Sequence, residues 1–106
     1  MRRTKFDGSN LSGTSLFGAT ATGASFRGAN LTGTSIESAD MEEVDFSDAI
    51  LEGAQVANTQ FGRNIIENSD WTDVLPRRDQ QKYLCSIAKG TNQTTGVDTR
   101  QSLGCK

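Results

Sequence analysis

The chain contains no histidine, and this absence excludes several kinds of chemistry at once. Serine-histidine-aspartate triads, histidine-ligated zinc sites and histidine general bases all need an imidazole. The 106 residues also include one proline, and only 34% are hydrophobic and 7% aromatic. An ordinary globular core would be thin at this composition, which is compatible with disorder unless the apolar residues follow a pattern.

Long apolar runs are missing as well. No stretch approaches 18 apolar residues, which excludes a transmembrane helix, and no apolar segment typical of a secretory signal follows Met1. The eleven glycines do not form a phosphate-binding loop, since the pattern G-x-x-x-x-G-K-S/T is absent. The sequence therefore predicts a protein that is not an enzyme and has no catalytic residue, cofactor or metal ligand.

What the chain does contain is a period of five residues. Every fifth residue from Phe6 to Trp71 is apolar, fourteen in succession, where the composition alone predicts about five. We call these positions the central positions. Two residues before each central position stands a small side chain in twelve of the fourteen cases, with Val44 and Asn64 as exceptions. The period fits neither an α-helix nor a long strand.

Short extended segments joined by tight corners would satisfy this period. The small and the large apolar residue lie two apart, so an extended backbone points both inward. Four such sides would close a coil of twenty residues, and central residues twenty apart would then stack in columns. Two columns form the predicted core stack: Phe6, Phe26, Phe46 and Ile66 in one, and Leu11, Leu31, Leu51 and Trp71 in the next.

Stretches such as Gly28-Ala29-Asn30-Leu31-Thr32 and Ser38-Ala39-Asp40-Met41 resemble the Ala-Asp/Asn-Leu-x-x quintets of the pentapeptide-repeat family. The resemblance covers residues 4–73. It implies an all-β solenoid, a right-handed quadrilateral β-helix of about three and a half coils. Residues 74–106 would follow it as a short α-helical cap.

Seven of the eleven glycines share one register, two residues after a central position: Gly8, Gly13, Gly18, Gly23, Gly28, Gly33 and Gly53. They either supply positive φ for type II corners or permit close stacking of the coils. Ser38, Glu43 and Asp48 occupy the same register in the next coil. We therefore expect the turn conformation to change near residue 38.

The register ends at Pro76, which suits the first turn of a helix. Leu84, Ile87 and Ala88 then form an apolar stripe at helical spacing, and Gly90 would end that helix. A second short helix is expected around Asp98 to Leu103. The stripe either covers the open end of the coil or binds a partner, and we favour the cap because coil edges and Trp71 would otherwise be exposed.

Cys85 lies on the first predicted helix and Cys105 just beyond the second. A structural disulfide is the favoured interpretation, and it points to an oxidising compartment. A redox-active pair remains open although no C-x-x-C motif is present, whereas zinc would lack ligands. The segment around both cysteines resembles lumenal members of the family, which implies the chloroplast thylakoid lumen and a transit peptide removed before this chain. Met1 would then be an added or internal methionine.

Charge is distributed unevenly. Residues 1–36 carry a net charge of +3, residues 37–73 carry −9 and residues 74–106 carry +4. Seven acids fall within one predicted coil, and we call them the acidic belt: Glu37, Asp40, Glu42, Glu43, Asp45, Asp48 and Glu52. The belt is either a solvated surface, a docking surface for a basic partner, or a weak site for a divalent cation, whose oxygen ligands it offers.

The sequence thus predicts a non-enzymatic structural or interaction module whose protein partner is unidentified, with no nucleic acid bound. Two alternatives stay open: a DNA mimic, since some bacterial members of the family resemble B-DNA and bind gyrase, and a lumenal protein regulated through Cys85 and Cys105. Nothing in the sequence caps the first coil. We therefore expect either that residues before it are missing or that another molecule covers Phe6, as in a weak end-to-end dimer; otherwise the chain is a monomer.

Overall fold

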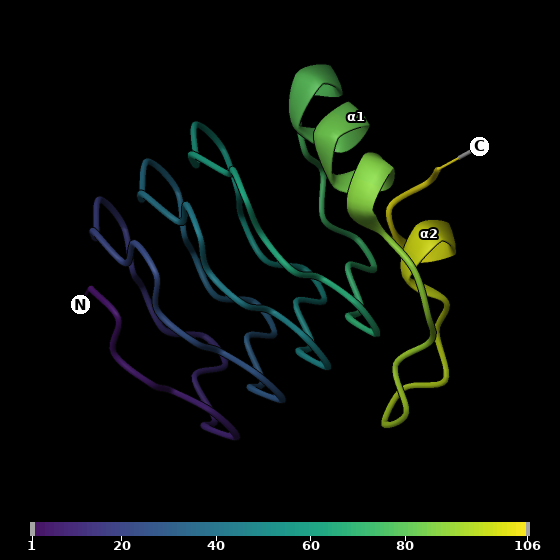
Figure 1. Ribbon diagram of the computed structural model, residues 1–106, viewed down its shortest axis with the longest axis horizontal. Coiled ribbons are helices and arrows are strands. Elements are labelled where there is room, and N and C mark those ends of the chain that lie inside the picture. Colours follow the sequence, from purple (N-terminus) through teal and green to yellow (C-terminus); the bar gives the residue numbers. More distant parts are fainter. Residues whose placement is uncertain (1, 106) are drawn as a thin grey trace.

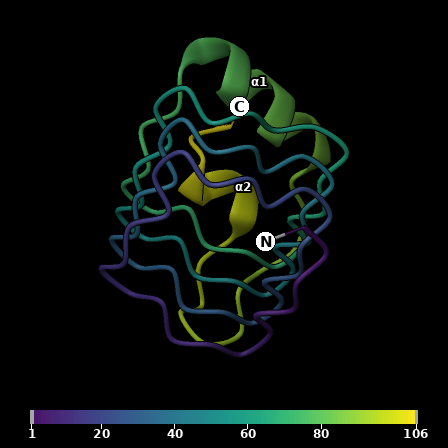
Figure 2. The same cartoon turned by 90° about the vertical axis from the view of Figure 1, so that its left-hand side faces the viewer.

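The computed structural model describes residues 2–105, so the expectation about Met1 lies outside the described residues. Residues 2–73 wind into coils that stack along one axis, and two helices cover the far end (Figure 1). Ten parallel bridges in the described chain each join residues twenty apart, from Lys5 with Ser25 to Ile50 with Asp70. The β-structure consists of these isolated bridges because a corner interrupts the backbone every five residues. Viewed down the axis, the coils superpose in outline (Figure 2).

The corners of the coil are tight turns with positive φ at the third residue, as in type II turns. In the first, the amide of Ser9 donates to the carbonyl of Phe6 at 3.1 Å, and Gly8 between them has φ +70°. The predicted change of turn conformation is wrong: φ stays positive at Ser38 (58°), Glu43 (61°) and Asp48 (62°). Close stacking does not explain the glycines either, since a Cβ at Gly28 or Gly53 would meet nothing within 4 Å. Glycine serves here to adopt positive φ without strain.

The central positions fill the interior of the coil. The rings of Phe6 and Phe26 stack at 5.0 Å between centroids, and those of Phe26 and Phe46 at 5.8 Å. Trp71 is fully buried and meets the ring of Phe46 edge-on at 5.8 Å, so it reaches across from its own column to a neighbouring one. Ile66, Leu31 and Leu51 are fully buried or nearly so, whereas Phe6 and Leu11 at the first coil are half-buried.

Helix α1 (Arg78–Ile87) and helix α2 (Thr99–Ser102) lie across the end of the last coil (Figure 1). Leu84 of α1 is fully buried and Ala88 just beyond it is 7% exposed, so the apolar stripe faces the coil. Pro76 precedes the N-cap Arg77 and therefore lies outside α1, two positions before its first residue Arg78, so the expectation that it stands in the first turn is wrong. Neither helix is long and apolar enough to cross a membrane.

Gly90 does not end α1, whose C-cap is Ala88. It lies two residues further on with φ +86°, where a Cβ would come within 1.9 Å of the Asn68 side-chain oxygen. The prediction of Gly90 as a helix terminator is therefore wrong. The glycine is required because the returning chain passes directly against the last coil, where the Lys89 carbonyl accepts from the Asn68 amide at 2.9 Å.

Candidate interaction surfaces

The acidic belt runs from the second half of the second coil into the first half of the third, and its members differ in what they contact. Asp40 and Asp45 precede central positions, and their carboxylates accept the backbone N–H two residues on, from Glu42 at 3.1 Å and Ser47 at 2.8 Å. These contacts are Asx turns, which hold the corner of the coil. Two of the seven acids are thereby part of the scaffold.

Two arginines from the adjacent coils reach the belt. Arg27, in the coil before, lies 3.9 Å from the Asp45 carboxylate, and Arg63, in the coil after, lies 3.4 Å from that of Glu43. The two residues of each pair are about twenty positions apart in the sequence, so local patterns did not reveal the pairs, although the period predicts such neighbours. Within residues 2–105, the other five belt acids have no ion pair: Glu37, Asp40, Glu42, Asp48 and Glu52.

The belt does not converge on a point. Among the described residues, no three acidic or cysteine side chains come together as a metal site. The acids of a four-sided coil point away from different sides, so they cannot supply the six to eight oxygens that Ca²⁺ takes. The cation interpretation of the belt therefore has no geometric support.

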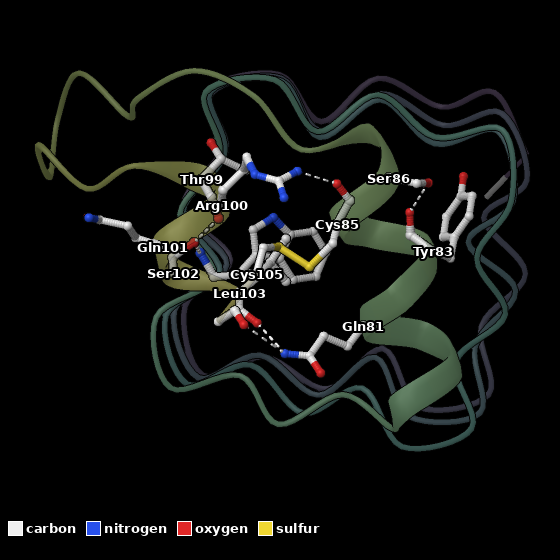
Figure 3. Close-up of a disulfide and its surroundings, with 12 residues drawn as sticks. Gln81, Tyr83, Cys85, Ser86, Thr99, Arg100, Gln101, Ser102, Leu103 and Cys105 are labelled. Atoms are coloured by element: carbon white, nitrogen blue, oxygen red, sulfur yellow. Dashed lines mark hydrogen bonds between the residues drawn. A yellow bond between two sulfur atoms is a disulfide. The ribbon is translucent and has the colours of Figure 1, made fainter.

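Cys85 and Cys105 form a disulfide with a Cα–Cα distance of 5.7 Å (Figure 3). It joins α1 to the chain just after α2, and both cysteines are half-buried. Further contacts lie beside it: Arg100 donates to the Cys85 carbonyl at 2.7 Å, and Gln81 to the Leu103 carbonyl at 2.7 Å. The disulfide thus closes the cap on itself.

Buried amide side chains attach the cap to the coil, and sequence reasoning missed two of them. The Gln80 side-chain amide of α1 donates to the carbonyls of Val56 and Thr59 at 3.0 and 2.9 Å. That of Asn92 donates to the carbonyl of Asn68 at 3.0 Å, and to two carbonyls of the preceding coil at 3.3 Å. No local pattern marks either residue, because their acceptors are brought near only by the folded coil.

Asn64 was visible in the sequence only as a break in the small-residue register. Its side chain donates to the carbonyls of Met41 and Val44 at 2.8 and 3.0 Å. Its own backbone N–H donates to the Tyr83 hydroxyl of α1 at 2.9 Å, in place of the usual turn acceptor. The exception in the register therefore marks the point where the helix replaces the next coil.

The opposite end of the coil is open. In the described chain the backbone N–H groups of Lys5, Asn10, Ser15 and Thr20 have no acceptor, whereas the equivalent Ser25 N–H donates to the Thr4 carbonyl at 2.9 Å. Half-buried Phe6, Leu11 and Leu16 form the floor of this end. A parallel coil edge of this kind can accept a further chain.

Comparison with known proteins agrees with this geometry. A family model described as pentapeptide repeats, with eight copies, matches residues 1–33 and 29–63. The chain is 50% identical over 48 residues to thylakoid lumenal 15 kDa protein 1 of Arabidopsis thaliana, a match that covers 45% of this chain and 21% of that protein. It is 52% identical over 40 residues to thylakoid lumenal protein TL20.3 of the same plant, covering 38% and 14% respectively.

Solved structures show the same relationship over more of the chain. A crystal structure of a pentapeptide repeat protein from the Arabidopsis thaliana thylakoid lumen is 42% identical with a TM-score of 0.97, covering 100% of this chain and 74% of that one. A pentapeptide repeat protein of the cyanobacterium Cyanothece shares the fold at a TM-score of 0.69 and 22% identity, over 70% of this chain and 50% of that one. The chain belongs to the pentapeptide-repeat family and is related to thylakoid lumenal proteins.

Proposed function

We propose that this protein is a non-enzymatic interaction module of the thylakoid lumen, which presents rigid coil faces to a protein partner. The observation that carries the proposal is the set of unpaired belt acids on a hydrogen-bonded backbone, since Glu42, Asp48 and Glu52 are exposed. Charges held in fixed positions favour a complementary basic surface and speed its approach. We also infer that the coil is the right-handed quadrilateral β-helix implied by the family, because four turns divide every twenty residues.

The proposed lumenal location and the proposed absence of catalytic activity rest on different observations. The Arabidopsis thaliana relatives named above are thylakoid lumenal proteins, and a disulfide persists best in an oxidising compartment. The interior is filled by buried side chains such as Phe26, Phe46 and Trp71, so the coil has no internal cleft for a substrate. A surface role is what remains for such a scaffold.

Cross-linking with mass spectrometry in isolated thylakoid lumen tests this proposal. The test variant neutralises four belt acids, Glu37, Glu42, Asp48 and Glu52, as E37Q, E42Q, D48N and E52Q. The control removes three carboxylates elsewhere, as D7N, E67Q and D79N. We expect the test variant to lose a cross-linked partner that the control retains. An identical set of partners for wild type and test variant would contradict a role for the belt.

Regulation through the disulfide is a second candidate, favoured by the half-exposed position of both cysteines in the cap. Reduction would separate the α2 segment from α1. If the Cys85–Cys105 potential, measured against glutathione mixtures, falls near the thioredoxin value of about −270 mV, the disulfide is redox-active. A potential well below about −300 mV would make it purely structural.

A DNA mimic is less compatible with this molecule. The principal dimensions are 32, 27 and 22 Å, so the molecule is not an elongated rod, and Arg27 and Arg63 interrupt the negative surface. We propose that it binds neither nucleic acid nor gyrase. Dose-dependent inhibition in a gyrase supercoiling assay would contradict this.

The open first coil also allows a weak end-to-end association of two copies of the chain. Two copies meeting at this end would bring together the exposed cations Arg2, Arg3 and Lys5 of each, which opposes tight pairing. We therefore propose a monomer at low salt that self-associates weakly as salt screens these charges. Sedimentation velocity at rising salt and protein concentration checks it, and a stable dimer at low salt would contradict it.

A further inference from the structure

A shallow hollow of about 240 Å³ lies where the coil meets the segment that leads to α1. Its floor is made by residues 53–57 of the third side, and its rim by Glu37, Asp73 and Leu75. The order along the coil axis follows from the backbone: the Gly18 amide donates to the Glu37 carbonyl at 3.0 Å, and the Ser38 amide to the Ala57 carbonyl at 2.9 Å. Phe17, Glu37 and Ala57 are therefore successive neighbours along one edge, and Leu75 lines the same hollow as Glu37 and Ala57.

Two exposed apolar side chains belong to this region: Leu75 lines the hollow, and Phe17 lies on the edge. Leu75 is 90% exposed and Phe17 67% exposed, so both place apolar surface in water at a cost that a partner would relieve. The backbone around Leu75 is held in place. Val74 before it is buried, and the Val74 amide donates to the Trp71 carbonyl at 3.1 Å. Pro76 follows Leu75, and its ring fixes the φ angle of Pro76 itself. The leucine is thus presented from a constrained segment.

Both charged residues that line the hollow, Glu37 and Asp73, are acidic, and no lysine or arginine is among the described residues that line it. Within residues 2–105, the ion pairs use Asp45, Glu43 and Asp79, and neither Glu37 nor Asp73 takes part in one. Glu37 accepts a hydrogen bond from the Ser35 hydroxyl at 3.3 Å. Two carboxylates beside the exposed aliphatic side chains of Ala57 and Leu75 complement a basic residue next to an aliphatic one.

We propose that this hollow is the specific docking site on the module for a protein segment that places a lysine or arginine between aliphatic side chains. The basic group lies between the Glu37 and Asp73 carboxylates, and an aliphatic side chain packs against Leu75 and Ala57. The inference rests on the proposed function and narrows it, because it moves the decisive contacts from the belt as a whole to one end of one edge.

The probe is the peptide acetyl-Leu-Lys-Leu-Lys-Leu-amide, titrated into the isotope-labelled full chain and followed by the backbone amide signals. We expect saturable shifts at Gly53, Gln55 and Ala57. Acetyl-Ser-Lys-Ser-Lys-Ser-amide keeps the charge but lacks the aliphatic groups, and should bind roughly tenfold more weakly. Binding of both peptides with equal affinity would overturn the apolar part of the proposal.

Variants locate the site. L75S should weaken binding of the leucine peptide about fivefold, and E37Q with D73N should weaken it by a similar factor at low salt. Both changes leave the interior untouched, and asparagine tolerates the positive φ of Asp73. D48N, a belt acid outside the hollow, is the matched control and should change the affinity less than twofold.

Two outcomes would overturn the docking site: shifts that map to other sides of the coil, or an affinity unchanged by L75S. Neither result would by itself contradict the proposed function, which is tested by cross-linking to lumenal proteins. Loss of cross-links in E42Q/D48N/E52Q, which keeps Glu37 and Asp73, together with cross-links retained in L75S, would place the partner on the rest of the belt and overturn the docking site.

Discussion

One backbone conformation recurs at single residues throughout the coil. Fifteen residues from Arg3 to Asp73, each five apart, have positive φ, and the last coils place serine, glutamate, asparagine and arginine there. A residue with a Cβ pays about 1–2 kcal/mol for left-handed φ, and the coil tolerates this because each corner is held by hydrogen bonds to the coils on either side. The stacked coils set the geometry of the corner, and the residue at the corner changes only the free-energy cost of adopting that geometry.

Ser38 offers a direct test of this cost. Ser38→Gly should raise the free energy of unfolding by about 0.5 kcal/mol, since relief of left-handed strain outweighs the entropy lost by glycine. Ser38→Val should lower it by about 1–2 kcal/mol. Glu52→Gly, at an exposed residue whose φ is not positive, is the control and should lower it by about 0.5–1 kcal/mol. Urea titrations measure all three, and a destabilising Ser38→Gly would contradict the strain argument.

Asp7 in the first coil gives a pH dependence. The Ser25 hydroxyl donates to its carboxylate and lowers the pKa of Asp7, as do the Arg27 backbone N–H at 3.0 Å and the charges of Arg27 and Lys5, while slight desolvation opposes them. Because the folded pKa lies below the unfolded value of about 3.9, the stabilisation is present above that pH and is lost as pH falls through the folded pKa.

Carbon-detected NMR of the Asp7 carboxyl should therefore give a midpoint below that of an unfolded aspartate. Ser25→Ala should move the midpoint upward, because the largest cause of the shift is then removed. Ser15→Ala, in the same register two corners earlier, is the control. An unchanged midpoint in Ser25→Ala would refute the assignment.

The elements that end the coil work through side-chain amides and one covalent bond. Helix α1 places Gln80 over the carbonyls of the third side, and the loop before α2 places Asn92 over those of the first. Both amides donate to backbone carbonyls at the end of the coil. The Cys85–Cys105 disulfide then limits how far the two cap segments can separate, an effect of about 3 kcal/mol for a loop of this length in the chain-entropy model.

Asn92→Ala tests this attachment. The substitution removes the donor to the Asn68 carbonyl and the acceptor for the Thr94 and Thr95 amides, so partly buried backbone groups lose their partners. We expect the free energy of unfolding to fall by roughly 2–3 kcal/mol. The neighbour Gln93 is exposed, and Gln93→Ala should change it by less than about 0.5 kcal/mol. Equal effects of the two substitutions would contradict an attachment through Asn92.

Considered as a whole, the molecule is a stack in which each coil contacts only its neighbours. The second and third coils have neighbours on both sides, the last is covered by α1 and α2, and the first has a neighbour on one side only (Figure 1). In such arrays stability is close to a sum of unit and interface terms, so an uncovered terminal unit opens first.

Hydrogen exchange should reveal this order along the axis. The amides of Phe6 and Leu11 donate to the second coil, and those of Phe46 and Leu51 make the equivalent bonds to the last coil. We expect the first pair to exchange at least about tenfold faster, because the first coil can open without breaking any other. Equal protection in all four amides would show that the coils open as one unit. Protection of the first pair that rises with protein concentration would indicate that another copy covers this end.

The sequence by itself determined the period, the coil of twenty residues, the identity of the central residues and the presence of a helical cap tied by two cysteines. It could do so because each coil is built from local rules: alternate residues of a short extended segment point the same way, and a corner follows. Even Arg63, the neighbour of Glu43, could have been found by counting twenty residues along the chain, although Arg27 lies eighteen residues before Asp45.

Only the tertiary structure decided the rest. The positive φ at Ser38 is imposed by the coils on either side, against the preference of the residue. Asn92 and Gln80 matter because folding brings distant carbonyls within their reach, and no spacing in the sequence records those distances. The hollow at Leu75 likewise arises where coil and cap meet, so the surface with the strongest case for recognition lies where the five-residue period has ended.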